Sequence, residues 1–406
     1  MIKNIRNNHN HTIRASYIGY VTQAIINTFA PLLFLTFQKT YDIDIEQITL
    51  LVTINFGTQL AVDFIAAHFA DKIGYKPLIV AAHLLAAAGL AGLGILPELL
   101  PDPYIGLLVA VIIYASGGGI LEVLVSPIVE ACPTEPSKKS AHMSVLHSFY
   151  CWGLVFIVIF STVFFNIFGT ENWKILAFVW AAVPLCNALY FTQTPILQLT
   201  GDGGGTTMTI KNLFSSGLFW LLLVLMICSG ASEQAMIQWA SVFAEAGLGV
   251  SKSVGDLAGP CLFAVLMGIS RVFYSKFSEK INLRKFMAGS SILCVASYLL
   301  ASLSPNPALS LAGCALCGLS VGIMWPGTFS VAAETCPKGG MALFALLALG
   351  GDLGCSAGPT VVGFVSGAVE NGIKTGVLTG IIFPALMIAG LVFLAKRNLW
   401  EKSDDA

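Results

Sequence analysis

The chain has 406 residues, of which 56% are hydrophobic and 11% are charged, and its mean hydropathy is +0.81. A soluble globular domain carries about 25% charged residues, so the composition excludes a water-soluble protein of this length. The net charge of −1 gives no electrostatic basis for a nucleic-acid partner.

Twelve apolar segments follow one another, at about 15–37, 46–70, 77–96, 104–130, 142–168, 173–192, 216–244, 254–276, 285–303, 308–334, 341–368 and 375–396. A helix of about 20 apolar residues crosses a hydrocarbon core of about 30 Å. The first segment is too long for a signal peptide, and no small-residue cleavage site follows it. We therefore predict an all-α integral membrane protein whose helices contact the lipid bilayer.

A polar, glycine-rich segment at 193–215 separates the first six apolar segments from the last six. This composition is typical of flexible linkers. We therefore predict an N-terminal six-helix bundle over 1–192, a cytoplasmic linker over 193–215 and a C-terminal six-helix bundle over 216–406.

The lysines and arginines predict the orientation in the membrane. Cytoplasmic loops carry an excess of these residues. With a cytoplasmic N-terminus, only four of the 21 lie on the outer side, namely Lys39, Lys174, Lys252 and Lys374. We therefore expect a multi-pass protein of the cell membrane with both termini in the cytoplasm.

The two halves repeat each other at the junction of their second and third segments. Residues 69–78 read Phe-Ala-Asp-Lys-Ile-Gly-Tyr-Lys-Pro-Leu, and 277–286 read Phe-Ser-Glu-Lys-Ile-Asn-Leu-Arg-Lys-Phe. Glu-Ala-Cys-Pro at 130–133 and Glu-Thr-Cys-Pro at 334–337 form a second matching pair. A parallel duplication of six helices predicts two pseudo-symmetric bundles with a solute site near the bilayer midplane.

These features resemble the major facilitator superfamily over essentially the whole chain. Its signature between helices 2 and 3 reads Gly, three spacers, Asp, a base, one spacer, Gly, one spacer and bases. Residues 67–77 follow that pattern, with Ala67 in place of the first Gly and Pro77 in place of a base. The resemblance implies the major facilitator fold and transport by alternating access.

The resemblance also implies that charge networks on the cytoplasmic side latch the outward-facing state. The alternative is ordinary solvated loop charge, which contributes little per pair. The candidate gating residues are Asp71, Lys72, Gly74, Lys76, Glu130, Arg271, Glu279, Lys280, Arg284 and Glu334.

A narrower resemblance is to the fucose permease group of sugar:proton symporters. Residues 118–127, Gly-Gly-Ile-Leu-Glu-Val-Leu-Val-Ser-Pro, are similar to its Leu-Glu-Thr-x-x-Asn-Pro stretch, and Glu122 falls on its membrane-embedded glutamate. Residues 146–153 resemble its helix 5 motif, with His147 at the polar position. That group carries an aspartate in helix 1, whereas 15–38 contains no acid and has Asn27 in that region.

Glu122 and His147 are the candidate proton-coupling residues. Glu122 lies far from either end of an apolar helix, where an ionised, unpaired carboxylate costs several kcal/mol. It is therefore expected to be protonated or bonded to a partner. An imidazole can relay a proton or bond a hydroxyl group. The alternatives are a Glu122 that ties helix 4 to a neighbour and a His147 that packs against a backbone carbonyl.

Helix 7 offers polar side chains for a solute. Gln234 and Gln238 are four residues apart and share a face, beside Glu233 and Trp239. Amides and a carboxylate can bond sugar hydroxyls, and an indole can cover the apolar face of a sugar. The alternative is an amphipathic outer end at the membrane interface, where Trp is common. The candidate solute-binding residues are Gln23, Asn27, Asn55, Glu122, His147, Glu233, Gln234, Gln238, Trp239, Trp325 and Asp352.

Three further charged residues lie within apolar segments. Asp352 stands among the glycines of 350–354 and is either a cavity acid or the partner of a base, for which Arg271 is a candidate. Arg271 and Asp63 occupy equivalent positions in the two halves. We interpret both mainly as gate or inter-bundle electrostatics, with a cation site at Asp63 as a minor alternative.

No Walker loop, HExxH, GxSxG or dinucleotide fingerprint occurs, and the ten cysteines lack zinc-ligand spacing, so we expect no catalytic residue, cofactor or resident metal. We predict secondary active transport of a small polar solute, a sugar, by proton symport. Sodium is the alternative coupling ion, and a monomer is the default state. The first alternative function is efflux of amphipathic compounds or drugs by proton antiport, and the second is a receptor that binds a solute without moving it.

Overall fold

The computed structural model describes residues 5–133, 136–197, 208, 210–277, 281–369 and 372–396, and within them it consists of helices joined by short turns. The chain divides into two compact units, Met1–Asp202 and Gly203–Ala406. The division falls inside the segment 193–215 that we interpret as a linker.

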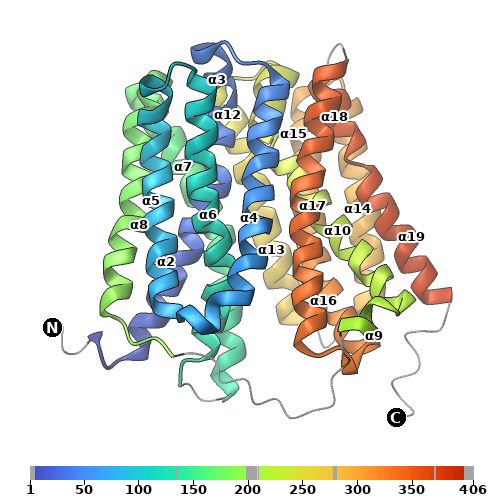
Figure 1. Cartoon of the computed structure of the whole chain (residues 1–406). Coiled ribbons are helices and arrows are strands. Elements are labelled where there is room, and N and C mark those ends of the chain that lie inside the picture. The colour runs from blue at the N-terminus through green and yellow to red at the C-terminus, as the bar shows by residue number, and fades with distance from the viewer. Residues whose placement is uncertain are drawn as a thin grey trace. The chain divides into compact units, whose positions relative to one another are not determined.

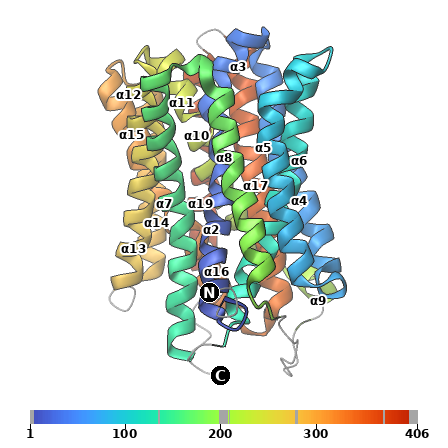
Figure 2. The same ribbon diagram turned by 90° about the vertical axis from the view of Figure 1, so that its left-hand side faces the viewer.

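The N-terminal unit contains six membrane-spanning segments, the first of which combines α2, η1 and α3. Figure 1 shows α4, α5, α6 and α8 side by side, and Figure 2 shows α7 and α8 from another side. The elements are α2 (His9–Thr28), the 3-10 turn η1 (Pro31–Leu33), α3 (Phe34–Tyr41), α4 (Ile45–Ile73), α5 (Tyr75–Leu99), α6 (Pro103–Glu130), α7 (Pro136–Phe168), the 3-10 turn η2 (Thr170–Asn172) and α8 (Trp173–Gln193).

The C-terminal unit also contains six spans, several of which are interrupted. Two of the interruptions are π-helical segments, η3 and η4. The elements are α9 (Ile210–Phe214), α10 (Gly217–Ile237), α11 (Ala240–Val242), η3 (Phe243–Gly247), α12 (Lys252–Asp256), η4 (Leu257–Cys261), α13 (Leu262–Phe277), α14 (Leu283–Leu303), α15 (Pro307–Val321), α16 (Met324–Thr335), the 3-10 turn η5 (Pro337–Gly339), α17 (Gly340–Ala368), α18 (Gly372–Thr379) and α19 (Ile382–Lys396).

The two units have the same internal packing. In the N-terminal unit the first span packs on the fifth, the second on the fourth, and the third on the fourth and sixth. In the C-terminal unit the seventh packs on the eleventh, the eighth on the tenth, and the ninth on the tenth and twelfth. One packing pattern therefore occurs twice in the same chain order, as expected for a parallel duplication.

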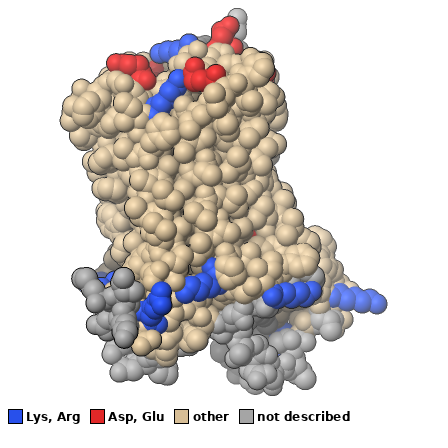
Figure 3. Space-filling model, turned by 60° about the vertical axis from the view of Figure 1, so that its left-hand side comes forward, with Lys and Arg blue, Asp and Glu red and all other residues tan. Residues whose placement is uncertain are grey.

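Twelve helical segments within the described residues are long and apolar enough to cross a membrane, which confirms the twelve predicted spans. Large apolar side chains such as Phe64, Leu189 and Ile292 are more than half exposed, as lipid-facing residues are. The face in Figure 3 has Lys and Arg at one end, mixed charges at the other and an uncharged belt between them. This belt is the surface expected to contact the hydrocarbon core.

Local sequence explains where α4 begins and where it turns into α5. Asp44 caps α4 by accepting from the backbone N–H of Gln47 at 2.7 Å, and Gln47 Oε1 accepts from the N–H of Asp44 at 3.0 Å. Gly74 joins α4 to α5 at φ +97°, where a residue with a Cβ is strained. The second glycine of the superfamily signature is therefore a conformational requirement of a one-residue turn.

The first span is interrupted next to its polar residues. Pro31 has no N–H to donate to the carbonyl of Asn27, so the α-helix cannot continue through this turn. Accordingly α2 ends at Thr28, and regular α-helix resumes at Phe34. In the C-terminal unit α10 ends at Ile237, within the run that carries the predicted solute-binding residues of helix 7. Interrupted helices of this kind form solute and ion sites in many transporters.

Candidate solute and proton site

A chain of side-chain amides links two helices of the N-terminal unit, α2 and α4. Gln23 of α2 donates from Nε2 to Oε1 of Gln59 on α4 at 2.8 Å, and Gln59 donates from Nε2 to Oδ1 of Asn27 at 2.9 Å. Asn55 donates from Nδ2 to the same oxygen of Asn27 at 3.3 Å. All four amide side chains are buried. The bonds from Gln23 to Gln59 and from Gln59 to Asn27 run in the same sense, so these two bonds polarise each other.

Each end of this amide chain reaches a titratable side chain. Gln23 also donates from Nε2 to Oε2 of Glu122 on α6 at 3.1 Å. At the other end, Asn27 donates from Nδ2 to the hydroxyl of Tyr150 on α7 at 3.5 Å. The structure therefore brings together four of the residues predicted separately from the sequence, namely Gln23, Asn27, Asn55 and Glu122.

Two adjacent glycines of α6 create the space for this network. A Cβ added at Gly118 would lie 3.2 Å from Oε1 of Gln23 and equally close to Oε1 of Gln59. A Cβ added at Gly119 would lie 2.7 Å from the backbone oxygen of Gln59 and 2.8 Å from Oδ1 of Asp63. Real Cβ atoms essentially never have contacts below 3.0 Å, and contacts near 3.2 Å are uncommon, so the Gly-Gly pair allows α2 and α4 to pack closely against α6.

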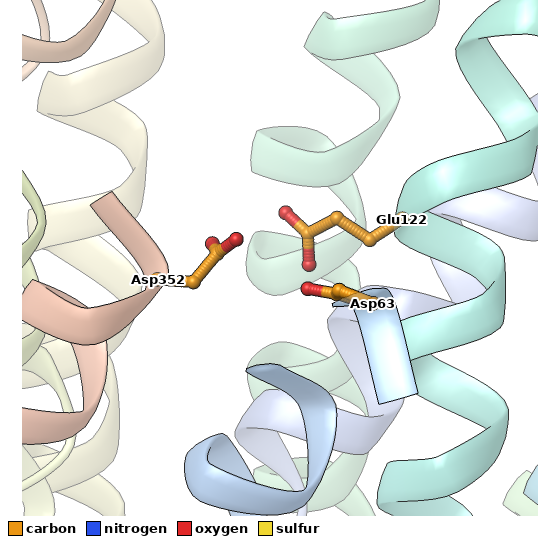
Figure 4. A group of neighbouring side chains, drawn as sticks. All are labelled: Asp63, Glu122 and Asp352. Atoms are coloured by element: carbon orange, nitrogen blue, oxygen red, sulfur yellow. The ribbon is translucent and has the colours of Figure 1, made fainter. Parts of the chain in front are cut away.

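Asp63 of α4 lies beside Glu122. Their side chains point toward each other (Figure 4), and a carboxylate oxygen of each lies within 4.8 Å of the other. Asp63 is 3% exposed, whereas Glu122 is exposed. Two carboxylates at this distance repel each other when both are ionised, so the pair favours a state that also holds a proton or a cation.

His147 lies on α7, one turn before Tyr150, and is exposed. Its ring packs edge-on against Tyr20 of α2, with the centroids 5.3 Å apart. The hydroxyl of Tyr20 lies 3.2 Å from Oγ of Ser126 on α6. The imidazole therefore lies in a second polar group on α2, α6 and α7, three of the four helices that carry the amide chain and the residues at its ends.

The C-terminal unit contains a similar amide chain that ends at a carboxylate. Gln238 donates from Nε2 to Oε1 of Gln234 at 3.0 Å, and Gln234 donates to Oε1 of Glu233 at 3.3 Å. The guanidinium of Arg271 on α13 donates to Oε2 of Glu233 at 3.4 Å. Glu233 and both glutamines are buried. The structure thus joins three predicted solute-binding residues and gives Arg271 a partner that the sequence did not predict.

The predicted aromatic and acidic residues of this unit have different surroundings. Trp239 is fully buried and donates from Nε1 to the backbone oxygen of Pro359 at 2.9 Å, which favours a packing role. Trp325 and Asp352 are half-buried. A Cβ added at Gly351 would meet the indole of Trp325 at 2.9 Å or less, so glycine is needed where α17 passes this ring.

The sequence matches a family profile over most of its length. The profile described as Major Facilitator Superfamily covers residues 16–359. The chain belongs to the Major Facilitator Superfamily. It is therefore a membrane transporter by family, and proteins of this superfamily are typically not enzymes.

Solved structures of other transporters have the same fold. A bacterial homolog of the human lysosomal transporter Spinster, inward-facing and unoccupied, has a TM-score of 0.77 at 15% identity, covering 97% of this chain and 98% of that chain. The transporter FucP in its outward conformation has a TM-score of 0.64 at 18% identity, covering 94% of this chain and 98% of that chain. An alanine variant of the Escherichia coli fucose:proton symporter FucP has a TM-score of 0.62 at 17% identity, with the same coverage. The sequence matches none of the curated proteins.

Apart from Arg271, which lies within α13, the described candidate gating residues of this major facilitator protein lie at or near helix ends. Lys76, in the first turn of α5, donates from Nζ to the backbone oxygen of Thr194 at 3.0 Å, and Lys72 lies 5.5 Å above the ring of Phe69. Glu130 ends α6 and is half-buried. Arg284, in the first turn of α14, is half-buried, and Glu334, near the end of α16, is exposed. The side chain of Asp71 and the residues Glu279 and Lys280 lie outside the described residues.

Sequence reasoning missed Gln59, Tyr150 and Tyr20. A signal for Gln59 was present, because Asn55, Gln59 and Asp63 are spaced by four residues and form one polar stripe on a helix. Gln23 and Asn27 form a matching stripe on α2. The pairing of the two stripes was not visible, because helical spacing shows which residues share a face but does not show which faces meet.

Proposed function

We propose that this protein is a secondary active transporter that moves a small polar solute, a sugar, together with protons by alternating access. The observation that supports this most strongly is the amide network of α2 and α4, which ends at Glu122. Amide groups offer donors and acceptors side by side, which suits the hydroxyl groups of a sugar. Transfer of polar side chains from water into an apolar span costs free energy, so such groups in a membrane helix usually mark a functional site.

Asn27, Asn55 and Tyr150 are the proposed solute contacts of the N-terminal unit. They lie beside the interruption of the first span and at the end of the network away from Glu122. Gln234, Gln238 and Glu233 are the proposed contacts of the C-terminal unit. Trp239 is omitted from this proposal because its indole is enclosed and already bonded.

Glu122 is the proposed proton carrier. The bond from Gln23 holds Oε2, so a proton on the other carboxylate oxygen leaves the network intact, and its loss strengthens the bond from Gln23. Gln59 then transmits this change to Asn27 through the directed amide chain. The network thereby offers a physical route by which the charge of Glu122 changes the affinity for a solute. His147 is proposed to deliver or accept the proton.

The proposed location is the cell membrane, with both termini in the cytoplasm, and a monomer is the default state. The distribution of Lys and Arg along the sequence supports the proposed orientation. The orientation is tested by fusing to the C-terminus a reporter that is active on only one side of the membrane.

Uptake into proteoliposomes tests the function. Purified protein is given a panel of labelled monosaccharides with and without an inside-alkaline pH gradient. Accumulation of one sugar only with the gradient supports proton symport. Equal uptake with and without the gradient rejects proton coupling, and the absence of any sugar uptake rejects the sugar. Drug resistance conferred on a pump-deficient host would then favour efflux.

A further inference from the structure

Tyr20 of α2 connects α6 to α7. Its hydroxyl lies 3.2 Å from Oγ of Ser126 on α6, and its ring packs edge-on against the imidazole of His147 on α7, with the centroids 5.3 Å apart. Tyr20 and Ser126 are half-buried, whereas His147 is exposed. One side chain therefore has its polar end bonded to α6 and its ring in contact with a candidate proton-coupling residue.

The contact between Tyr20 and Ser126 lies next to the bond between Gln23 and Glu122. Tyr20 is three residues before Gln23 on α2. Ser126 is four residues after Glu122 on α6. Residues at these spacings share one face of a helix. The two hydrogen bonds are therefore successive links between the same two helices, about 4.5 to 6 Å apart along the helix axes.

The helices α2 and α6 approach each other closely at this point. A Cβ added at Gly19 would lie 3.3 Å from Cγ2 of Val125, and these two residues directly precede the bonded pair Tyr20 and Ser126. A serine side chain is short, so its bond to the tyrosine hydroxyl requires this close approach. Because the hydroxyl is held at α6, the ring of Tyr20 cannot turn away from α7 without breaking the bond.

We propose that Tyr20 and Ser126 are positioning residues for His147. Their hydrogen bond fixes the tyrosine ring, and the ring holds the imidazole beside the part of α6 that carries Glu122. Proton transfer requires the donor and the acceptor to be held in a defined geometry, and small displacements slow it strongly. This inference rests on the proposed function, in which His147 delivers or accepts the proton.

Three further titratable side chains lie on the neighbouring turns. Tyr17 of α2 stacks on Phe149 of α7, with the centroids 4.6 Å apart. Tyr150 follows one turn after His147 on α7, and Glu122 precedes Ser126 on α6. A measurement made at the imidazole of His147 itself is therefore needed to separate its ionisation from that of its neighbours.

Chemical modification of the full-length protein in detergent tests the positioning without any solute. Diethyl pyrocarbonate acylates the neutral imidazole, and mass spectrometry resolves the product at His147 from those at the other histidines. The rate is measured as a function of pH. Tyr20→Phe keeps the ring and removes the hydroxyl, whereas Ser126→Ala removes the partner. We expect the rate at His147 to rise about 2- to 10-fold in both variants, the range that loss of one hydrogen bond produces.

Two further variants make the test specific. Ser126→Thr keeps a hydroxyl group and should react as the wild-type protein does. The double variant Tyr20→Phe, Ser126→Ala should react at the same rate as either single variant, because the two hydroxyls act through one bond.

Proteoliposomes test the same variants in transport. Tyr20→Phe and Ser126→Ala should slow gradient-driven uptake about 10-fold and leave solute exchange without a gradient unchanged. Ser116→Ala on α6 is the matched control. It removes only a bond of 2.7 Å from the serine hydroxyl to the backbone oxygen of Ile112, and it should change neither the modification rate nor the uptake.

Several results would overturn the inference. An unchanged rate at His147 in Tyr20→Phe would show that the hydroxyl does not hold the ring, and multiplicative effects in the double variant would show that the two hydroxyls act separately. Equal losses of exchange and of gradient-driven uptake would assign Tyr20 and Ser126 to solute binding or to stability. If Ser126→Ala does not fold, Tyr20→Phe and Ser126→Thr still decide. If the wild-type protein shows no gradient-driven uptake, the proposed function fails, whereas the modification rates still decide the positioning.

Discussion

Gln23 and Glu122 are joined by a hydrogen bond of 3.1 Å from Nε2 to Oε2 that connects α2 to α6 within the N-terminal unit. The same nitrogen donates to Gln59, so one amide bridges a carboxylate and a network of three further amides. Hydrogen bonds to charged groups contribute about 1.5 to 3 kcal/mol, more than bonds between neutral groups. The ionisation state of Glu122 therefore affects the strength of its hydrogen bond from Gln23, and through Gln23 it affects the amide chain.

Glu122→Gln should abolish gradient-driven accumulation and leave exchange of solute across the membrane within about threefold of wild type. The amide preserves shape and can still accept from Gln23, but it cannot take up and release a proton. The measurement is uptake in proteoliposomes, compared with counterflow in the absence of a gradient. Loss of exchange to the same degree would show that Glu122 binds the solute or supports the fold.

Gln59→Leu should raise the KM for the solute about tenfold, because it removes both the bond from Gln23 and the bond to Asn27. Each such bond contributes about 0.5 to 1.5 kcal/mol, and about 1.4 kcal/mol corresponds to a tenfold change. Thr49→Val on the same helix is the control. It removes only a bond of 2.7 Å from the threonine hydroxyl to the backbone oxygen of Ile45. Concentration dependence of initial uptake measures both. Equal KM values for the two variants would show that the amide chain does not contribute to solute binding.

Gly119→Ala should lower the melting temperature and reduce transport. The added methyl group would lie 2.7 Å from the backbone oxygen of Gln59, and overpacking of this kind costs about 1 to 3 kcal/mol. Gly57→Ala on α4 is the control, since nothing lies within 4 Å of a Cβ at that position. That variant should be as stable as wild type or more stable, because alanine favours helix by about 0.5 to 1 kcal/mol over glycine. A normal melting temperature for Gly119→Ala would show that α6 can move away from α4 at little cost.

Arg271→Gln should destabilise the C-terminal unit more than the double variant Glu233→Gln, Arg271→Gln. The single change leaves the buried carboxylate of Glu233 without the guanidinium that contacts it at 3.4 Å. Removing one partner of a buried pair costs about 3 to 5 kcal/mol in the strongest cases, and the effect is smaller here because the Arg271 side chain is 27% exposed. A double-mutant cycle of melting temperatures measures the coupling. Additive effects would mean that the pair contributes nothing to stability.

The sequence by itself determined the membrane architecture. Spans are visible because a helix must be apolar over about 20 residues to cross a bilayer, whatever its neighbours are. The duplication was visible in matching loop motifs, and the need for Gly74 follows from a turn that only glycine adopts without strain. Glu122 was identified because a carboxylate in the middle of an apolar helix is unusual regardless of the fold.

Only the tertiary structure decided which side chains meet. Helical spacing groups Asn55, Gln59 and Asp63 on one face, but contact with Gln23 depends on how closely α2, α4 and α6 approach at Gly118 and Gly119. The enclosure of Trp239 likewise depends on α17, more than a hundred residues later in the chain. Burial and pairing depend on packing between segments that are far apart in the sequence. The local sequence around a residue therefore does not show which segments will pack against it.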